Sequence, residues 1–122
     1  MTFEEFDILL AERFAKSKCV LMAKSAEYAK DNDKLHNFKL AAHVGRVTVP
    51  QAWFGMWLKH LISLIDMIES GEQPTAHWVD EKIGDLVNYL YLLEAIYEDS
   101  LHSRALDGGD TCKDYGEHPA SH

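Results

Sequence analysis

The spacing of apolar residues constrains the fold of this chain more than any other feature. From residue 3 to about residue 30, apolar side chains recur every three or four positions, as on one face of an α-helix. Similar periods cover residues 33–44, 48–70 and 76–101, and no stretch shows the strict alternation of a β-strand. The sequence therefore predicts an all-α domain of about four helices.

Residues that suit helix ends lie at the limits of these periods. Thr2, Thr48 and Thr75 are expected to cap the first, third and fourth helices, because threonine oxygens accept hydrogen bonds from free backbone N–H groups. Gly45 is expected to adopt the left-handed conformation that closes the second helix, and Gly71 is expected to end the third.

The last predicted helix is apolar on two sides. Ile83 and Leu90 belong to one stripe, and Leu92 and Ile96 belong to another. A helix of this kind is usually central in a bundle or shared with a partner chain. We therefore expect a homo-oligomer.

Composition narrows the class of protein. The length of 122 residues predicts a single domain at 1–105, and residues 106–122, which lack a helical period, predict a flexible C-terminal tail. A net charge of -8 argues against binding to long nucleic acids. There is no apolar run long enough for a membrane span, no secretory signal and no CxxC motif. We expect a soluble, cytoplasmic protein.

Lys24 continues an otherwise apolar stripe, and Glu27 and Tyr28 lie within one helical turn of it. One interpretation is a lysine whose stem covers the core edge while its ammonium group reaches water. The other is a lysine at the rim of a pocket, oriented by Glu27 and directed at an anion.

A second polar group lies on the last predicted helix. Glu81, Asp85, Asn88 and Tyr89 share one face, beside the stripe that contains Leu92. This face is either an ordinary solvated stripe or a ligand site. In a ligand site, carboxylates one turn apart would share a Mg²⁺ ion.

The third predicted helix carries two further candidates. His60 lies on the same side as Trp53 and Trp57, where a histidine is more often a satisfied core residue than a ligand. Lys59 lies on the opposite side, as a surface charge or part of a subunit contact. The aromatic side chains are most simply core, although they also suit stacking on a nucleobase.

Taken in order, these motifs resemble a known family. Lys24-x-x-Glu27-Tyr28, Asn37-Phe38, Lys59-His60 and Asp85-Leu-Val-Asn88-Tyr89 are similar to motifs of the nucleotide-modification-associated helical domain family of phages and bacteria. The resemblance covers residues 20–98. It implies a role in deoxynucleotide metabolism or modification, in multimers whose sites lie between helices. The ligand-binding residues that it implies are Lys24, Tyr28, Asn37, Lys59, His60, Asn88 and Tyr89.

The last predicted helix also resembles the MazG-type all-α nucleotide pyrophosphatases. Glu81-Lys-Ile-Gly-Asp85 is similar to their E-E-L-G-D segment, with Lys82 in place of the second glutamate. In that segment the second glutamate and the aspartate bind Mg²⁺, so this resemblance implies Mg²⁺ as cofactor with Asp85 as a ligand. If the protein is an enzyme, we expect Asp85 to hold the metal together with Glu81 or Glu27. Glu81 and Asp85 are then the candidate metal ligands, and Glu27 and Asp85 the candidate catalytic residues.

Three functional hypotheses follow. The first is a Mg²⁺-dependent nucleotide pyrophosphohydrolase, or a related nucleotide-modifying enzyme, located in the host cytoplasm if a phage encodes it. The second is a non-catalytic protein that sequesters a nucleotide or a nucleotide-derived small molecule. The third is a structural or protein-interaction bundle, in which the polar residues only fix helix register.

Overall fold

The computed structural model describes residues 1–28 and 33–104, and side chains within 1–23 and 33–102. Within these ranges the chain forms four α-helices and no strand. They are α1 (Phe3–Tyr28), α2 (His36–Gly45), α3 (Val49–Ser70) and α4 (Ala76–Arg104). The all-α prediction is confirmed, with helix ends within a few residues of those expected. Residues 106–122, the predicted tail, lie outside the described part.

All three threonine caps are present. The Thr2 side chain accepts a hydrogen bond from the Glu5 backbone N–H at 3.0 Å, and the Glu5 carboxylate accepts one from the Thr2 N–H. Thr48 and Gln51 form the same reciprocal capping box at the start of α3. The Thr75 hydroxyl accepts from the backbone N–H of the third residue of α4, at 3.1 Å. These caps fix where the three long helices begin.

The prediction for the end of α3 is confirmed, whereas the prediction for the end of α2 is not. α3 ends at Ser70, so that Gly71 follows the helix as predicted, and Gly71 adopts the left-handed conformation, with φ of 71°. The prediction for Gly45 is wrong by one residue, because Gly45 remains in α2 and Arg46 takes the left-handed conformation, with φ of 55°. There the N–H groups of Arg46 and Val47 donate to the carbonyls of His43 and Ala42. This is the Schellman pattern, whose two hydrogen bonds offset the strain of a non-glycine residue at this position.

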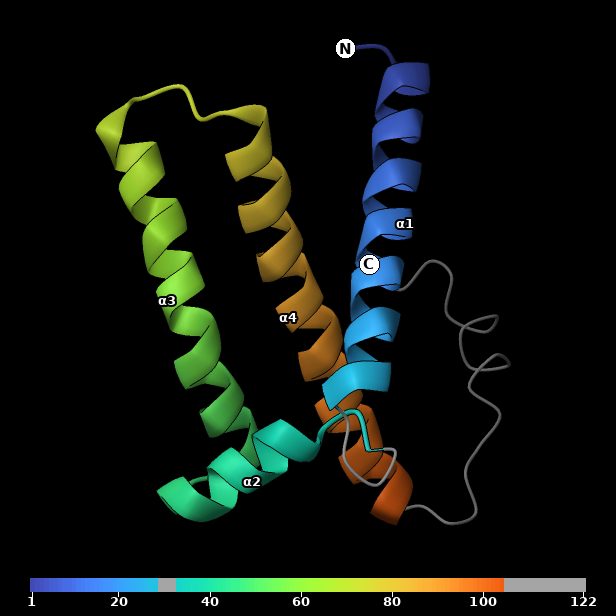
Figure 1. The fold of residues 1–122 in the computed structure, drawn as a ribbon, viewed down its shortest axis with the longest axis vertical. Coiled ribbons are helices and arrows are strands. Elements are labelled where there is room, and N and C mark those ends of the chain that lie inside the picture. Colours follow the sequence, from blue (N-terminus) through green and yellow to red (C-terminus); the bar gives the residue numbers. More distant parts are fainter. Residues whose placement is uncertain (29–32, 105–122) are drawn as a thin grey trace, which may run out of the picture.

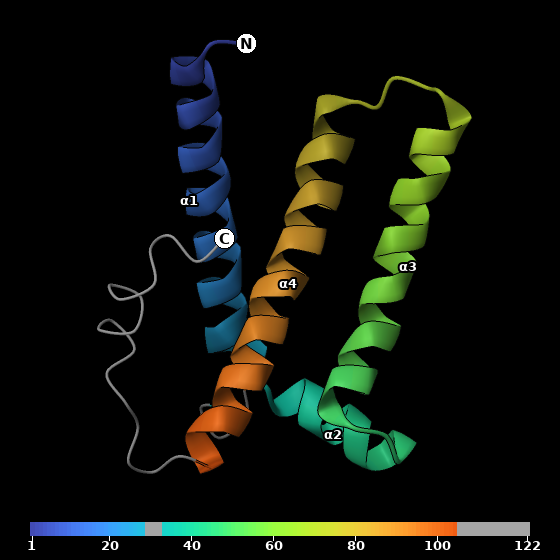
Figure 2. The same ribbon diagram turned by 180° about the vertical axis from the view of Figure 1, so that it is seen from behind.

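The three long helices lie in a row, with α4 between α1 and α3 (Figures 1 and 2). α1 and α4 run in the same direction, α3 runs in the opposite direction, and α2 crosses one end of the row. The central place of α4 agrees with its two apolar stripes. The described helices thus form essentially one layer, closed at one end by α2.

The buried core lies where α2, α3 and α4 meet. Leu35, Phe38, Trp53 and Ile96 form one buried cluster, and apolar residues of α3 and α4 pack around it. Leu35, Phe38 and Ala42 are buried, as their spacing predicted. None of the α1 side chains that the structure describes, residues 3–23, belongs to this cluster, and α1 contacts α4 elsewhere. None of the described helices is long and apolar enough to cross a membrane.

Candidate functional site between α3 and α4

Two tryptophans fix the relation between α3 and α4. Trp53 and Trp57, one turn apart on α3, stack with ring centroids 5.1 Å apart and an interplanar angle of 18°. The indole N–H of Trp53 donates to the backbone carbonyl of Tyr89 on α4, at 2.6 Å. Because Trp53 is buried, this bond satisfies a polar group that would otherwise cost about 1–3 kcal/mol. The hydrogen bond between Trp53 and Tyr89 helps to fix the rotation of α4, and so determines which α4 residues face α3.

His60, Asp85 and Tyr89 come together at this interface. The His60 Nδ1 atom lies 3.8 Å from the Asp85 carboxylate, within ion-pair range but longer than a hydrogen bond. The His60 ring centroid is 5.1 Å from that of Tyr89. The side chains of His60 and Asp85 are 17% and 34% exposed, so the group lies at the edge of the packed interface, partly open to solvent. An imidazole beside a carboxylate and a phenol is suited to binding or proton transfer.

The phenol of Tyr89 is held in its neutral form. Burial raises the pKa of Tyr89 above its ordinary value, and the nearby charge of Asp85 raises it further. The ring is also packed edge-on against Phe38 of α2, at a centroid distance of 6.2 Å. Tyr89 therefore offers a hydrogen-bond donor in a fixed place at neutral pH.

Asn88 is buried, and its side-chain oxygen has no hydrogen-bond partner among the described residues. The indole N–H of Trp57 and the hydroxyl of Ser17 on α1 are in the same situation. Buried polar atoms of this kind are uncommon and cost free energy unless a partner satisfies them. Asn88 thus carries an unmet acceptor on α4, one helical turn after Asp85.

The remaining predicted residues on α2, α3 and α4 lie apart from this group. Asn37 and Lys59 are exposed. Glu81 is exposed as well, and its carboxylate lies 3.2 Å from the imidazole of His77, one turn earlier in α4. Among the residues described here, no three His, Cys, Asp or Glu side chains are grouped so as to hold a metal ion. Glu81 and Asp85 therefore lack a third described donor.

Three predicted residues belong to the end of α1. The backbones of Lys24, Glu27 and Tyr28 are part of α1, but their side chains lie outside the described residues. α1 contacts α4 through Asp80 and Gly84, whereas Asp85 faces α3. The role of Lys24 as a ligand-binding residue therefore remains a prediction.

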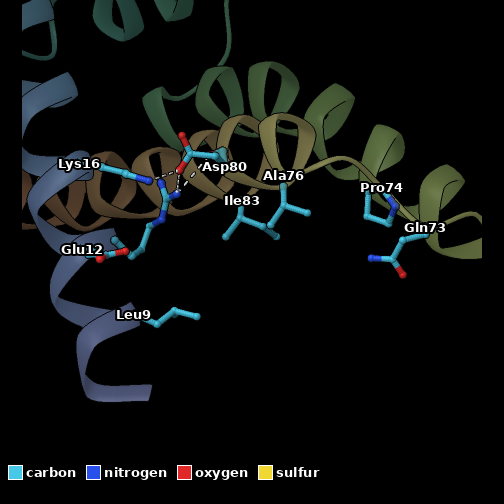
Figure 3. Close-up of a pocket in the computed structure, with 10 residues that line it drawn as sticks. Leu9, Glu12, Lys16, Gln73, Pro74, Ala76, Asp80 and Ile83 are labelled. Atoms are coloured by element: carbon cyan, nitrogen blue, oxygen red, sulfur yellow. Dashed lines mark hydrogen bonds and ion pairs between the residues drawn. The ribbon is translucent and has the colours of Figure 1, made fainter. Parts of the chain in front are cut away.

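The α1–α4 contact has a polar centre that the sequence did not indicate. Arg13 and Lys16 of α1 both donate to the carboxylate of Asp80, with Lys16 Nζ at 3.1 Å (Figure 3). These ion pairs lie at a cleft of about 490 Å³, whose walls include Leu9 and Ile83. In the sequence, Arg13, Lys16 and Asp80 are indistinguishable from charged residues on the solvent-exposed side of a helix. The one local signal was the glycine at position 84, in the middle of a helical period.

Gly84 explains how Arg13 approaches α4. A Cβ atom at position 84 would lie 2.6 Å from the Arg13 guanidinium, which is closer than van der Waals contact allows. The absence of a side chain at Gly84, which is buried, lets the guanidinium pass beside the helix and reach Asp80.

Comparison with known proteins identifies no relative of this chain. No family model matches the chain, and no curated protein or solved structure is detectably similar to it.

Proposed function

We propose that this protein binds a nucleotide or a nucleotide-derived small molecule beside His60, Asp85 and Tyr89, as small helical proteins of phages and bacteria do. One observation carries the proposal. Three residues that the sequence motifs singled out, from helices α3 and α4, meet in a half-buried group beside an aromatic cluster. Polar residues that serve only solubility are expected on the open surface, and not together in a half-buried group.

The chemistry of the group suits such a ligand. The imidazole N–H of His60 would donate to a phosphate oxygen, and the neutral phenol of Tyr89 would donate to a phosphate or carbonyl oxygen. Asn88 has a side-chain oxygen in need of a donor, which an exocyclic amine of a nucleobase supplies. Lys24, at the end of α1, is the residue we expect to add positive charge.

Binding without turnover is the form of this function that the described donors support better. Mg²⁺-dependent hydrolysis would require Asp85 together with Glu81 or Glu27, and Glu81 is paired with His77 on the exposed side of α4. Hydrolysis therefore requires the Glu27 carboxylate, or one from a second copy of the chain, to complete a magnesium site beside Asp85. It is the second candidate, and its cofactor would be Mg²⁺. Either activity would draw on the nucleotide pool of the cytoplasm, where we place the protein.

A thermal-shift screen tests binding. The full chain is melted with each deoxynucleoside mono- and triphosphate, with and without Mg²⁺, and product release is followed in the same samples. A ligand at 100 times its Kd stabilises the folded state by about 2.7 kcal/mol, which raises Tm by several degrees. A rise without product supports binding alone, and a rise with product supports hydrolysis. If no nucleotide raises Tm under either condition, the proposed function is wrong.

A structural role is the alternative that a separate observation favours. Many large apolar side chains of α1, α3 and α4 are exposed in the single chain, among them Phe3, Phe54, Ile68 and Tyr97. Apolar surface on this scale is typical of proteins that associate. We therefore propose that the protein acts as a homo-oligomer, whether or not it also binds a nucleotide.

A further inference from the structure

α1 leaves a regular apolar stripe uncovered. Phe6, Leu10 and Phe14 follow one another at four-residue spacing, so they lie along one side of the helix. Their exposed fractions are 47%, 50% and 57%, and Phe3, one turn earlier, is 92% exposed. α1 lies at the outer edge of the row of helices, with α4 as its neighbour (Figures 1 and 2). The described chain therefore leaves about half of Phe6, Leu10 and Phe14, and nearly all of Phe3, uncovered.

The exposed area is substantial for one helix. The fractions for Phe3, Phe6 and Phe14 add up to about two whole phenylalanine side chains. At 150–250 Å² for each aromatic side chain, this is roughly 300–500 Å² of apolar surface. A specific interface buries about 800 Å² on each partner. The stripe and the residues that flank it can therefore supply most of one side of such an interface.

The charges of α1 are divided between its two halves. Every charged side chain in residues 1–12 is acidic: Glu4, Glu5, Asp7 and Glu12. The next twelve residues carry only basic side chains: Arg13, Lys16, Lys18 and Lys24. Two such helices would repel if they packed side by side in the same direction. In opposite directions, each acidic half would lie against a basic half.

The spacing of the stripe fixes the register of an antiparallel pair. With Leu10 opposite the Leu10 of a second copy, Phe6 lies opposite the second Phe14, because both are four residues from the centre. Glu4 and Lys18 then come within about one helical turn of each other along the axis, on the same flank of the stripe. The apolar stripe therefore centres the antiparallel pair on Leu10, and the Glu4–Lys18 pairing centres it within one residue of Leu10.

We propose that a second copy of this chain packs its α1 antiparallel against this α1, with the two-fold axis close to Leu10. This inference rests on the proposed self-association and names its surface. Phe6, Leu10 and Phe14 form the apolar centre, and Glu4 pairs with Lys18 of the other copy. The contact adds a second layer to a row of helices that has one, which is how helical domains usually bury an apolar face.

Cysteine cross-linking tests the direction and the register. In full-length protein with Cys19 and Cys112 replaced by serine, Phe6→Cys and Phe14→Cys variants are oxidised separately and as a mixture. Residues 6 and 14 of different copies are opposite in the proposed pair, whereas two residues 6 are separated by eight residues, about 12 Å along the axis. That separation exceeds the reach of a disulfide. A cross-linked dimer is expected in the mixture and not in either variant alone.

Charge reversal supplies an independent test, by analytical ultracentrifugation of the full chain. Glu4→Lys and Lys18→Glu are each expected to weaken dimerisation at least threefold, and the double variant is expected to regain it. Glu69→Lys makes the same charge change at an exposed position of α3, which α4 separates from α1 (Figures 1 and 2), and is expected to leave dimerisation unchanged. A wild-type chain that is monomeric at high micromolar concentration overturns both the self-association and this surface. An oligomer with no 6–14 cross-link, and with an unchanged dissociation constant in both single variants, overturns the surface alone.

Discussion

Tyr89 connects three helices through three different contacts. Its backbone carbonyl accepts from Trp53 of α3, its ring packs against Phe38 of α2, and its phenol lies near Asp85 on its own helix. The phenol is the part whose chemistry depends on pH. Since burial and a neighbouring carboxylate both oppose its ionisation, the folded state keeps the proton at a pH where the unfolded state has lost it.

Replacement of Tyr89 by phenylalanine is expected to change the alkaline stability of the protein. The neutral Tyr89 phenol contributes to the free energy of unfolding. This contribution is constant below pH 10.0, the ordinary pKa of tyrosine, and is lost as pH rises through the higher pKa of the folded state. At neutral pH the variant should lie within about 1 kcal/mol of the wild type. Between pH 10 and 11, urea denaturation should show the wild type losing more stability than Tyr89→Phe. Parallel curves for the two proteins would contradict the assignment.

Gly84→Ala separates helix propensity from the Arg13 contact. Alanine in a helix interior is favoured over glycine by about 0.5–1 kcal/mol, but its Cβ would displace the Arg13 guanidinium. In an Arg13→Ala background the substitution should therefore stabilise the protein by about that amount. With Arg13 present, the gain should be smaller or absent. Equal gains in both backgrounds, measured by chemical denaturation, would show that the close approach does not matter.

At the scale of single residues, sequence reasoning singled out His60, Asp85 and Tyr89 as candidates but could not place them against one another. The proximity of His60 to Asp85 and Tyr89 depends on the rotation of α3 against α4, which the Trp53 hydrogen bond helps to fix. The Arg13–Asp80 pair could not be predicted, because charged residues 67 positions apart give no local pattern. Such a contact requires knowledge of which helices are neighbours.

The helices themselves follow closely from local chemistry. Apolar spacing located all four, and the threonine caps fixed the starts of the three long ones. The residue expected to close α2 was wrong by one position, because a two-bond Schellman closure allows Arg46 to take the position expected of glycine. The order of helices in space was not predictable in the same way, since the short α2 permits more than one arrangement.

The attachment of α1 to α4 is expected to weaken in acid. A hydrogen bond from Lys16, and a second from Arg13, hold the pKa of Asp80 below its ordinary value of 3.8. The stabilising contribution of this carboxylate is therefore complete above pH 3.8 and is lost as pH falls through the lower folded pKa.

Asp80→Asn removes this titration while keeping the shape of the side chain. Hydrogen exchange of α1 amides, compared at pH 6 and pH 3, should show acid-induced opening in the wild type. The variant should already be open at pH 6 and should change little. Asp99→Asn, at an exposed carboxylate that pairs with Lys39 of α2, is a matched control and should leave α1 exchange unchanged. Identical pH dependence of α1 in wild type and Asp80→Asn would contradict the role given to Asp80.

At the scale of the whole molecule, the single chain is a row of three helices closed at one end. Its buried cluster joins α2, α3 and α4, and α1 is attached through a contact with a polar centre. The exposed stripe on α1 and the candidate site between α3 and α4 lie on different helices. Association through α1 therefore leaves His60, Asp85 and Tyr89 accessible to a ligand.

The central claim is that a nucleotide binds beside His60. Isothermal titration calorimetry with the nucleotide that most raises Tm tests it, using wild type, His60→Gln and His77→Gln. Both histidines lie near a carboxylate, but His77 is on the exposed surface, with a side chain 87% accessible. We expect His60→Gln to weaken binding at least tenfold, which corresponds to about 1.4 kcal/mol, and His77→Gln to bind as the wild type does. Unchanged affinity in a folded His60→Gln protein would contradict it.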